Sequence, residues 1–286
     1  PRETLALVGE SGCGKTTAGK ALVGLAPVSA GSIVAHGRTE LQNLRQRELQ
    51  PFRKTIQMIF QDPFSSLDPR LTIGETIAEG MEIHCPRHTA RERHAIMAGL
   101  IAKVGLPTDA LGRYPHQFSG GQRQRIGLAR SLAVNPDVVI CDECTSALDV
   151  SVQAQILNLL KDLQAELGLA YLFITHDLGV VSFLADRIAV MYLGRVVEQG
   201  LTHEVLAAPR HPYCKALLAS APTLEPSGGR SGKLRAPGDV PSPVNPPSGC
   251  HFHPRCPHAK AACRAGAPPR ADFSPTHFCV CHFPLG

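Results

Sequence analysis

A glycine-rich stretch near the start of the chain has the composition of a loop that holds phosphate groups. Residues 9–16 read Gly-Glu-Ser-Gly-Cys-Gly-Lys-Thr, between an apolar run at 5–8 and a helix-compatible run at 17–25. Glycines let backbone N–H groups approach phosphate oxygens closely, and the following helix N-terminus adds donors and partial positive charge. Lys15 is predicted to reach the β- and γ-phosphates of a nucleotide, and the Thr16 hydroxyl to bind Mg²⁺. A plain glycine-rich turn is the alternative, and it leaves the full pattern unexplained. The residues of this stretch predicted to contact the nucleotide are Gly9, Glu10, Ser11, Gly12, Cys13, Gly14, Lys15, Thr16 and Thr17.

Two acidic residues end an apolar run further along the chain. Residues 138–141 read Val-Val-Ile-Cys and are followed by Asp142 and Glu143. An apolar run without alternation is typical of a parallel strand buried on both faces, and ligands of such sheets bind at the carboxyl ends of the strands. We therefore predict that Asp142 holds Mg²⁺ and that Glu143 is the general base that polarises an attacking water. The alternative is that the two acids end a strand and cap the next helix.

A second glycine pair, Gly120 and Gly121, predicts another phosphate-binding helix end. Ser119 before the pair is a common N-cap residue, and the segment from Gln122 to Leu132 reads as an amphipathic helix with basic residues on its polar face. The two glycines leave room for a ligand against the backbone, and the helix N-terminus attracts anions. A surface helix with a polar cap is the alternative for this segment taken alone.

These segments together resemble the ATP-binding cassette (ABC) ATPases over nearly the whole chain. Gln61 follows the apolar run 56–60 and matches the Q-loop glutamine, His176 matches the switch histidine, and Asp149 ends the Ser-Ala-Leu-Asp of a D-loop. The resemblance implies two ATP molecules sandwiched between two subunits. It implies catalytic roles for Gln61 and His176 beside Glu143, Mg²⁺ contact by Gln61, and nucleotide contact by Asp149. It assigns four residues to the nucleotide of the partner subunit: Ser119, Gly120, Gly121 and Gln122.

Finer matches resemble the ATPases of dipeptide and oligopeptide importers. They lie at residues 60–70, 146–156, 211–213 and 240–250. The resemblance implies a subunit that powers import of peptides, or of related solutes such as nickel. Its expected partners are a second, different ATPase subunit, two transmembrane permeases and an extracytoplasmic solute-binding protein. The expected place is the cytoplasmic face of the bacterial inner membrane, as a peripheral subunit.

Some positions depart from the family pattern. Cys144 stands where proline is usual after the glutamate, and Phe118 where leucine is commoner. The chain also begins at Pro1, without the strands and the adenine-stacking aromatic residue that family members have upstream. We therefore expect a truncated chain that binds ATP more weakly than a full-length relative. Cys13 is expected to be an inert structural cysteine, and an oxidation-sensitive thiol at a helix N-terminus is the alternative.

The motifs need a sheet to position them, which predicts an α/β fold of the P-loop NTPase class with a mostly parallel sheet. We assign residues 1–62 and 136–202 to the ATP-binding core and residues 63–135 to an inserted helical subdomain that carries the signature. Residues 203–286 form a small, irregular, cysteine-rich C-terminal extension. A hairpin that turns at Gly194 closes the core, and one or two helices follow it.

The extension holds the second chemical signal. Cys250, Cys256, Cys263, Cys279 and Cys281 account for half of the chain's ten cysteines. A chain that needs ATP is expected where thiols stay reduced, so a metal or cluster site is favoured over disulfides. The spacing lacks the tight pairs usual for zinc, whereas four looser thiolates can hold an iron–sulfur cluster.

The family resemblance selects the ligands of that site and leaves Cys279 spare. It implies a [4Fe–4S] cluster held by Cys250, Cys256, Cys263 and Cys281. Zn²⁺, with His251 or His282 in place of one thiolate, is one alternative, and a reduced, metal-free tail is the other.

Composition and motif content weigh against other classes of protein. The 286 residues carry a formal charge of +5 without a long basic block, so we expect no nucleic-acid partner. No apolar stretch approaches the ~18 residues of a membrane span. An ABC protein acting on nucleic acid or the ribosome remains one alternative, although tandem cassettes and coiled-coil arms are missing. A weakly hydrolysing regulatory subunit is the other, disfavoured because Lys15, Asp142, Glu143 and His176 are all present.

Overall fold

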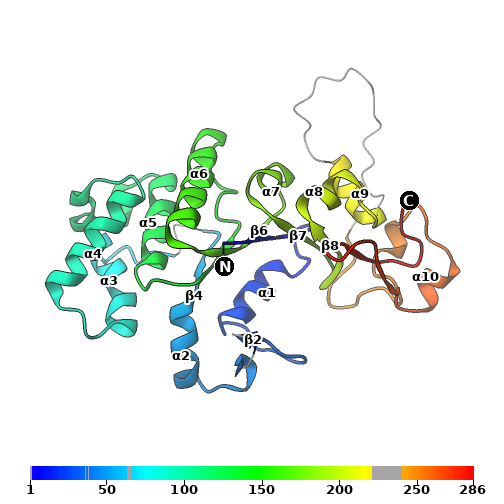
Figure 1. The fold of residues 1–286 in the computed structure, drawn as a ribbon, viewed down its shortest axis with the longest axis horizontal. Coiled ribbons are helices and arrows are strands. Elements are labelled where there is room, and N and C mark those ends of the chain that lie inside the picture. The colour runs from blue at the N-terminus through cyan, green and yellow to red at the C-terminus, as the bar shows by residue number, and fades with distance from the viewer. Residues whose placement is uncertain (1, 36, 38, 63–65, 221–239) are drawn as a thin grey trace. The chain divides into compact units, whose positions relative to one another are not determined.

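The computed structural model describes residues 2–35, 37, 39–62, 66–220 and 240–286 (Figure 1). They form two compact units, one built chiefly from Thr16–Phe173 and the other from Glu3–Lys15 together with Ile174–Gly286. The boundaries of these two units differ from those of the three domains expected from the sequence. The three-domain division stays a prediction. Part of the importer-like segment at 60–70, residues 63–65, lies outside the described residues.

The strands of the first unit end at the residues expected to do chemistry. The order is β4 (Ile56–Ile59), β5 (Val138–Asp142) and β6 (Ala170–Thr175). β4 and β5 run parallel, with Ile56 opposite Val138 and Ile59 opposite Cys141. Residues 139–142 of β5 are all buried, which is the burial expected of a strand covered on both faces. The apolar runs before Gln61 and Asp142 are therefore adjacent strands that end at one edge.

Helices of the first unit begin at side chains that cap them. The helices are α1 (Lys15–Leu22), α2 (Gln46–Thr55), α3 (Ile73–His84), α4 (Ala90–Lys103), α5 (Gly120–Leu132) and α6 (Val150–Leu167). Thr72 caps α3 and Thr89 caps α4, each with a glutamate in the third helical position that bonds back to the cap. Gly168, with φ of 70°, ends α6 in the left-handed conformation. Helices α3, α4 and α5 pack together (Figure 1). The unit also contains the short pair β2 (Val34–Ala35) and β3 (Thr39–Glu40), and the 3₁₀ turns η1 (Leu41–Asn43), η2 (Thr108–Gly112) and η3 (Pro115–Gln117).

The second unit has strands from both ends of the chain. The order is β1 (Thr4–Val8), β7 (Arg187–Tyr192), β8 (Arg195–Leu201), β10 (Phe278–Val280) and β9 (Arg270–Asp272). β1 pairs parallel with β7, and the remaining pairs are antiparallel. The predicted hairpin is confirmed: Leu193 and Gly194 both have positive φ, as a tight hairpin turn requires. The final residues thus add two strands beside this hairpin.

Short helices and an aromatic cluster complete the second unit. The helices are α7 (Leu178–Leu184), α8 (Thr202–Ala207), α9 (Pro212–Ala219) and α10 (Ala261–Ala265), with the 3₁₀ turn η4 (His253–Arg255). Tyr192, Tyr213 and Phe252 are each 1% exposed, and their ring centroids lie 4.7–5.4 Å apart. Phe252 therefore anchors the cysteine-rich segment in a core that also supports β7 and α9.

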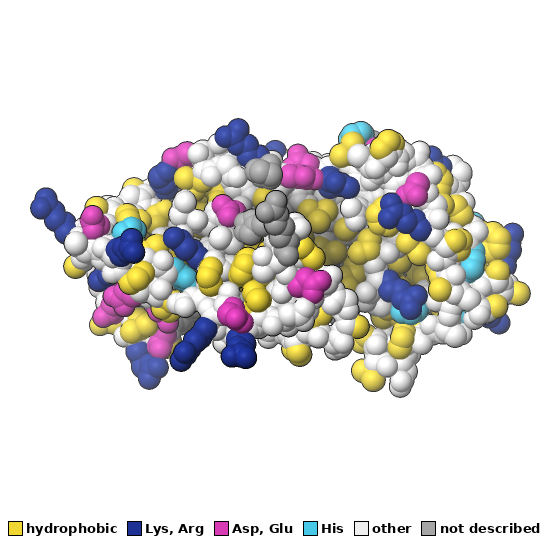
Figure 2. All heavy atoms as spheres, turned by 60° about the horizontal axis from the view of Figure 1, so that its bottom comes forward, with side chains coloured by type: hydrophobic (Ala, Val, Ile, Leu, Met, Phe, Trp, Pro, Cys, Tyr) yellow, Lys and Arg dark blue, Asp and Glu magenta, His cyan; other side chains and the backbone are white. Residues whose placement is uncertain are grey.

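The surface carries both signs of charge. On the face that Figure 2 shows, basic and acidic side chains are interspersed over the molecule. This agrees with the small net charge of +5. Among the residues that the structure describes, no helix has the length and apolar character that crossing a bilayer requires.

Candidate active site

The glycine-rich loop follows β1 and leads into α1. Gly12 and Gly14 have φ of 80° and 103°, in the left-handed region that favours glycine. At Gly9, an added Cβ would lie 2.2 Å from the carbonyl oxygen of Met191, so the loop packs directly on the backbone of β7. Lys15 is 5% exposed, and its Nζ donates to the carbonyl oxygens of Gly9 at 2.7 Å and Glu10 at 3.1 Å. The ammonium group therefore lies within its own loop.

Cys13 is a packing residue of this loop. It is 2% exposed, and burial raises the pKa of its thiol. Its carbonyl oxygen accepts a hydrogen bond from the Gly194 N–H at 2.9 Å, which ties the loop to the hairpin turn. A buried thiol with a raised pKa is poorly reactive, so the structure favours the inert interpretation.

Thr16 and Asp142 bring together oxygen atoms suited to Mg²⁺. The Thr16 hydroxyl donates to Asp142 Oδ1 at 3.0 Å, and Asp142 is 2% exposed. Hydroxyl and carboxylate oxygens are hard ligands of the kind that Mg²⁺ prefers. Thr16 and Asp142 lie 126 positions apart in the sequence, yet their oxygen atoms are close enough to bind one Mg²⁺ ion together.

Gln61 and Glu143 meet at the ends of β4 and β5. Gln61 Nε2 donates to Glu143 Oε2 at 2.9 Å. Glu143 has φ of 45°, an uncommon conformation for a residue with a side chain, and its carbonyl oxygen accepts from the N–H and hydroxyl of Ser146. Strained backbone of this kind occurs at functional sites, where surrounding contacts hold it. The catalytic roles of both residues remain predictions.

The signature segment starts α5 with a reciprocal cap. Ser119 Oγ accepts from the Gln122 N–H, and the Ser119 N–H donates to Gln122 Oε1 at 3.0 Å, which confirms Ser119 as the N-cap. An added Cβ at Gly121 would lie 2.4 Å from Val152 Cγ1 on α6, so close packing inside this chain demands that glycine. Gly120 has no such close contact, since its nearest neighbour would be 3.9 Å away. Contact of either glycine with a nucleotide stays a prediction.

The remaining predicted residues are spread over both units. The Asp149 carboxylate caps α6 by accepting from the Val152 N–H at 2.9 Å. Thr17 is exposed on α1 in the first unit. His176 follows β6 and belongs to the second unit. Cap geometry explains why Asp149 has its residue type without reference to a ligand.

Comparison with known proteins decides the family. Residues 1–146 match the family described as "ABC transporter", and residues 197–263 match "Oligopeptide/dipeptide transporter, C-terminal region". The chain belongs to the ABC transporter family. It is an ABC-type ATPase that uses ATP and Mg²⁺.

Relatives of this ABC ATPase align over almost all of the chain. It is 49% identical to the oligopeptide transport ATP-binding protein AppF of Bacillus subtilis, over 98% of this chain and 85% of that protein. It is 48% identical to the corresponding OppF of Haemophilus influenzae, over 98% of this chain and 84% of that protein.

Solved structures of other cassettes share the fold. The CbiO1 subunit of the Clostridium perfringens transporter complex CbiONQ has a TM-score of 0.64 at 28% identity, covering 72% of this chain and 80% of that one. The ATP-binding cassette MJ0796, solved as a dimer with ADP and phosphate, has a TM-score of 0.61 at 29% identity, covering 70% of this chain and 86% of that one. The predicted fold class is confirmed.

One set of contacts in this ABC ATPase was missed by sequence reasoning. The Glu10 carboxylate pairs with both terminal nitrogens of Arg255, at 2.7 and 3.0 Å, and the Glu10 N–H donates to the Tyr213 hydroxyl at 2.9 Å. Glu10 and Arg255 are 245 residues apart in the chain. No local pattern marks such a pair. The only available signal was an acidic residue in an anion-binding loop.

The four predicted cluster ligands of the ABC ATPase face one small cavity. Cys250, Cys256, Cys263 and Cys281 line it, whereas Cys279 does not and is completely buried in β10. A hydrogen bond from Cys279 lowers the pKa of Cys281 to about 7, while burial raises the pKa of Cys256 to about 11. All ten cysteines are free thiols. Within the described ranges, no three His, Cys, Asp or Glu side chains lie close enough to form a ready metal site.

Proposed function

We propose that this chain is the ATP-hydrolysing subunit of an importer of peptides or of related solutes such as nickel. The observation that carries the proposal is the joint match of the cassette and of the oligopeptide-type C-terminal region in one chain. The relatives named as oligopeptide transport proteins support it, since they align over 98% of the chain.

The residues of the site divide the work of hydrolysis. Lys15 exchanges its bonds to the Gly9 and Glu10 carbonyls for the β- and γ-phosphate oxygens of ATP. Thr16 and Asp142 would hold Mg²⁺, which when bound would supply positive charge beside the phosphates. Glu143 accepts the proton of the attacking water, and the amide of Gln61, now bonded to Glu143, orients that water.

The signature serves a second nucleotide in a dimer with another ATPase subunit. Ser119 and Gln122 are both exposed at the N-terminal end of α5, where backbone N–H groups and the helix dipole favour an anion. The reciprocal cap holds the Ser119 hydroxyl and the Gln122 amide in place before the partner arrives. A heterodimer follows from the importer assignment, with His176 and Asp149 contributing to the same pair of sites.

A groove in the first unit is the proposed docking site for the permeases. It has a volume of about 510 Å³ and is lined by residues of α2, β4, α3 and α5 and by the segment that follows α1. Leu25 and Ile83 in its wall are 57% and 53% exposed. Apolar side chains exposed in a concave surface suit a cytoplasmic helix of a membrane partner. This docking places the subunit peripherally at the cytoplasmic membrane face, while an extracytoplasmic protein delivers the solute.

The cysteine set of the extension is proposed to hold a [4Fe–4S] cluster. Four thiols on one cavity are the donor set that such clusters use. Zn²⁺ is the alternative, and His282 suits it better than His251, because His282 lines the cavity and His251 does not. Iron and sulfide assays on protein purified without oxygen test the proposal. One equivalent of zinc without iron would refute it.

Copurification tests the whole assignment. The tagged chain should be recovered with two permeases and one different ATPase subunit, and ATP hydrolysis by this complex should rise when a peptide-loaded binding protein is added. Leu25→Asp should lose the permeases, whereas Val34→Asp, on an exposed strand away from the groove, should keep them. Recovery of nucleic acid in place of permeases would contradict the proposal.

A further inference from the structure

Glu10 places an acidic side chain in a loop that is predicted to bind anions. It is the second residue of a loop whose backbone donors and lysine are built to attract the negative charge of phosphates. An unpaired carboxylate there would repel a polyphosphate. Some other group must offset this charge if the loop is to bind ATP well.

Arg255 offsets the charge of Glu10. Two parallel hydrogen bonds join its terminal nitrogens to the two carboxylate oxygens. The Arg255 side chain is 7% exposed and that of Glu10 is 31% exposed, so water screens the pair only in part. The guanidinium also lies 5.9 Å from the ring centroid of Tyr192 and 6.0 Å from that of Phe252. Bidentate geometry and aromatic contact both fix its orientation.

The backbone of the phosphate loop is held by the aromatic cluster that Arg255 contacts. The Tyr213 hydroxyl accepts from the Glu10 N–H at 2.9 Å, and Tyr213 packs on Phe252 with ring centroids 5.4 Å apart. The Gly9 and Glu10 carbonyls are the acceptors of Lys15. Tyr213 of α9 therefore helps to set the conformation of the Gly9 and Glu10 peptide groups. Lys15 must release the carbonyl oxygens of these groups to bind phosphate.

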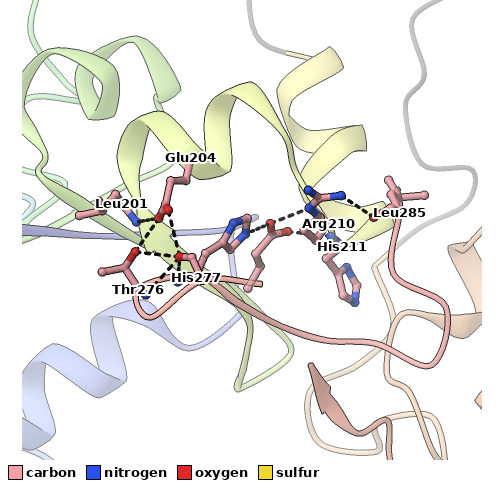
Figure 3. Close-up of polar contacts among 9 residues, drawn as sticks. Leu201, Glu204, Arg210, His211, Thr276, His277 and Leu285 are labelled. Atoms are coloured by element: carbon pink, nitrogen blue, oxygen red, sulfur yellow. Dashed lines mark hydrogen bonds and ion pairs between the residues drawn. The ribbon is translucent and has the colours of Figure 1, made fainter. Parts of the chain in front are cut away.

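Buried polar contacts anchor the extension to its own unit, as Figure 3 shows. Glu198 on β8 is 0% exposed and accepts from the Arg210 and His211 N–H groups and from His277 Nε2, each at 2.7–2.8 Å. Glu204 accepts from the hydroxyls of Ser274 and Thr276. The segment that carries Arg255 is held in turn by Phe252, whose ring packs against Tyr192 and Tyr213.

We propose that Arg255 is a positioning residue of the nucleotide site, which neutralises the Glu10 carboxylate and holds the Glu10 side chain next to the peptide group that Tyr213 binds. The cysteine-rich extension is then a working part of ATP binding. This inference rests on the chain's binding of ATP and is independent of the solute that the transporter carries. It goes beyond peptide import, and it does not depend on what the cysteines hold.

Calorimetric titration of the full chain with MgATP tests the inference. Arg255→Gln leaves Glu10 uncompensated and should raise the Kd for ATP roughly tenfold, within the range expected for one partly screened charge. Glu10→Gln removes the repelling charge and should tighten ATP binding several-fold. The double variant E10Q/R255Q should return the Kd to within about threefold of the wild-type value, since neither charge remains.

A role in stability alone predicts a different pattern. It predicts that ATP binding weakens in every variant that melts earlier, including Glu10→Gln and the double variant. Arg270→Gln is the matched control, because Arg270 pairs with Asp272 on β9 of the same extension and both are exposed. Its Kd should equal that of the wild type.

Several results would overturn the inference. One is an Arg255→Gln chain that is folded and binds ATP like the wild type. Another is weaker ATP binding by Glu10→Gln, and this variant decides the matter if Arg255→Gln does not fold. In the assembled transporter, the effect should fall on the KM for ATP with kcat nearly unchanged. Loss of peptide-stimulated turnover in wild-type protein that still binds ATP would count against peptide import and leave this inference standing.

Discussion

Gln61 Nε2 donates a hydrogen bond to Glu143 Oε2 at 2.9 Å, across the ends of two neighbouring parallel strands. The amide that must orient a water is thus bonded to the carboxylate that must take the water's proton. The backbone of Glu143 has a φ of 45°, which is uncommon for a residue other than glycine, and the bond to Gln61 helps to hold its side chain in place. A water that enters between the two groups would replace this bond with two new ones.

Glu143→Gln should abolish turnover and keep ATP binding. The amide cannot accept a proton, so kcat should fall roughly 10²–10⁴-fold, the usual contribution of a general base. The Mg²⁺ ligands Thr16 and Asp142 are unchanged, so the variant should accumulate as an ATP-bound dimer with its partner. Phosphate release and size-exclusion chromatography with MgATP measure the two effects. Glu166→Gln, at an exposed position of α6, is the control, and normal turnover in Glu143→Gln would mean that the base is misassigned.

Thr16→Val should separate metal use from nucleotide binding. The hydroxyl that lies 3.0 Å from Asp142 Oδ1 is lost while the shape of the side chain is kept. We expect the Mg²⁺ concentration for half-maximal hydrolysis to rise about tenfold, in line with the loss of one oxygen ligand. Binding of ATP without Mg²⁺ should change little. Thr108→Val, in η2 and exposed, serves as the control, and an unaltered Mg²⁺ dependence in Thr16→Val would argue against this ligand.

Local patterns predicted the strands that carry the chemistry. The apolar runs before Gln61 and Asp142 became β4 and β5, and the positive φ of Gly194 matches the predicted hairpin. These features depend on neighbours in sequence, where periodicity and turn chemistry are visible. Lys15 Nζ bonds the Gly9 and Glu10 carbonyl oxygens of its own loop, and its contact with phosphate stays a prediction.

Contacts between distant segments were not predictable in this way. An added Cβ at Gly121 would clash with Val152 on α6, and the sequence pattern did not predict this contact. The pairing of β10 with β8, and that of Arg255 with Glu10, join residues about 80 and 245 positions apart. A short strand of three residues and a single arginine carry no periodic signal, so only the folded chain brings these partners together.

Glu198→Gln should destabilise the second unit. Glu198 is fully buried and accepts three hydrogen bonds, whereas a glutamine would turn its NH₂ group toward at least one of these donors. Leaving buried donors unsatisfied should cost about 2–4 kcal/mol of unfolding free energy. Urea unfolding measures the loss, and hydrogen exchange should show β10 among the strands that open first. Glu166→Gln should cost less than about 1 kcal/mol, as for other exposed pairs. Equal stability of the two variants would contradict the role given to Glu198.

Acid should weaken the caps of α3 and α4. Hydrogen bonds from Thr72 and Thr89 lower the pKa of Glu75 and Glu92 below the ordinary 4.5. A carboxylate whose pKa is lower in the folded state stabilises that state fully above the unfolded pKa, and the effect is lost as pH falls through the folded pKa. The urea midpoint of Glu75→Ala/Glu92→Ala should therefore lie below that of the wild type near pH 6 and approach it below pH 4.5. Because the other carboxylates are present in both proteins, their titration cancels in the difference. A difference that stays constant with pH would mean that the two glutamates stabilise the helices by packing, without their charge.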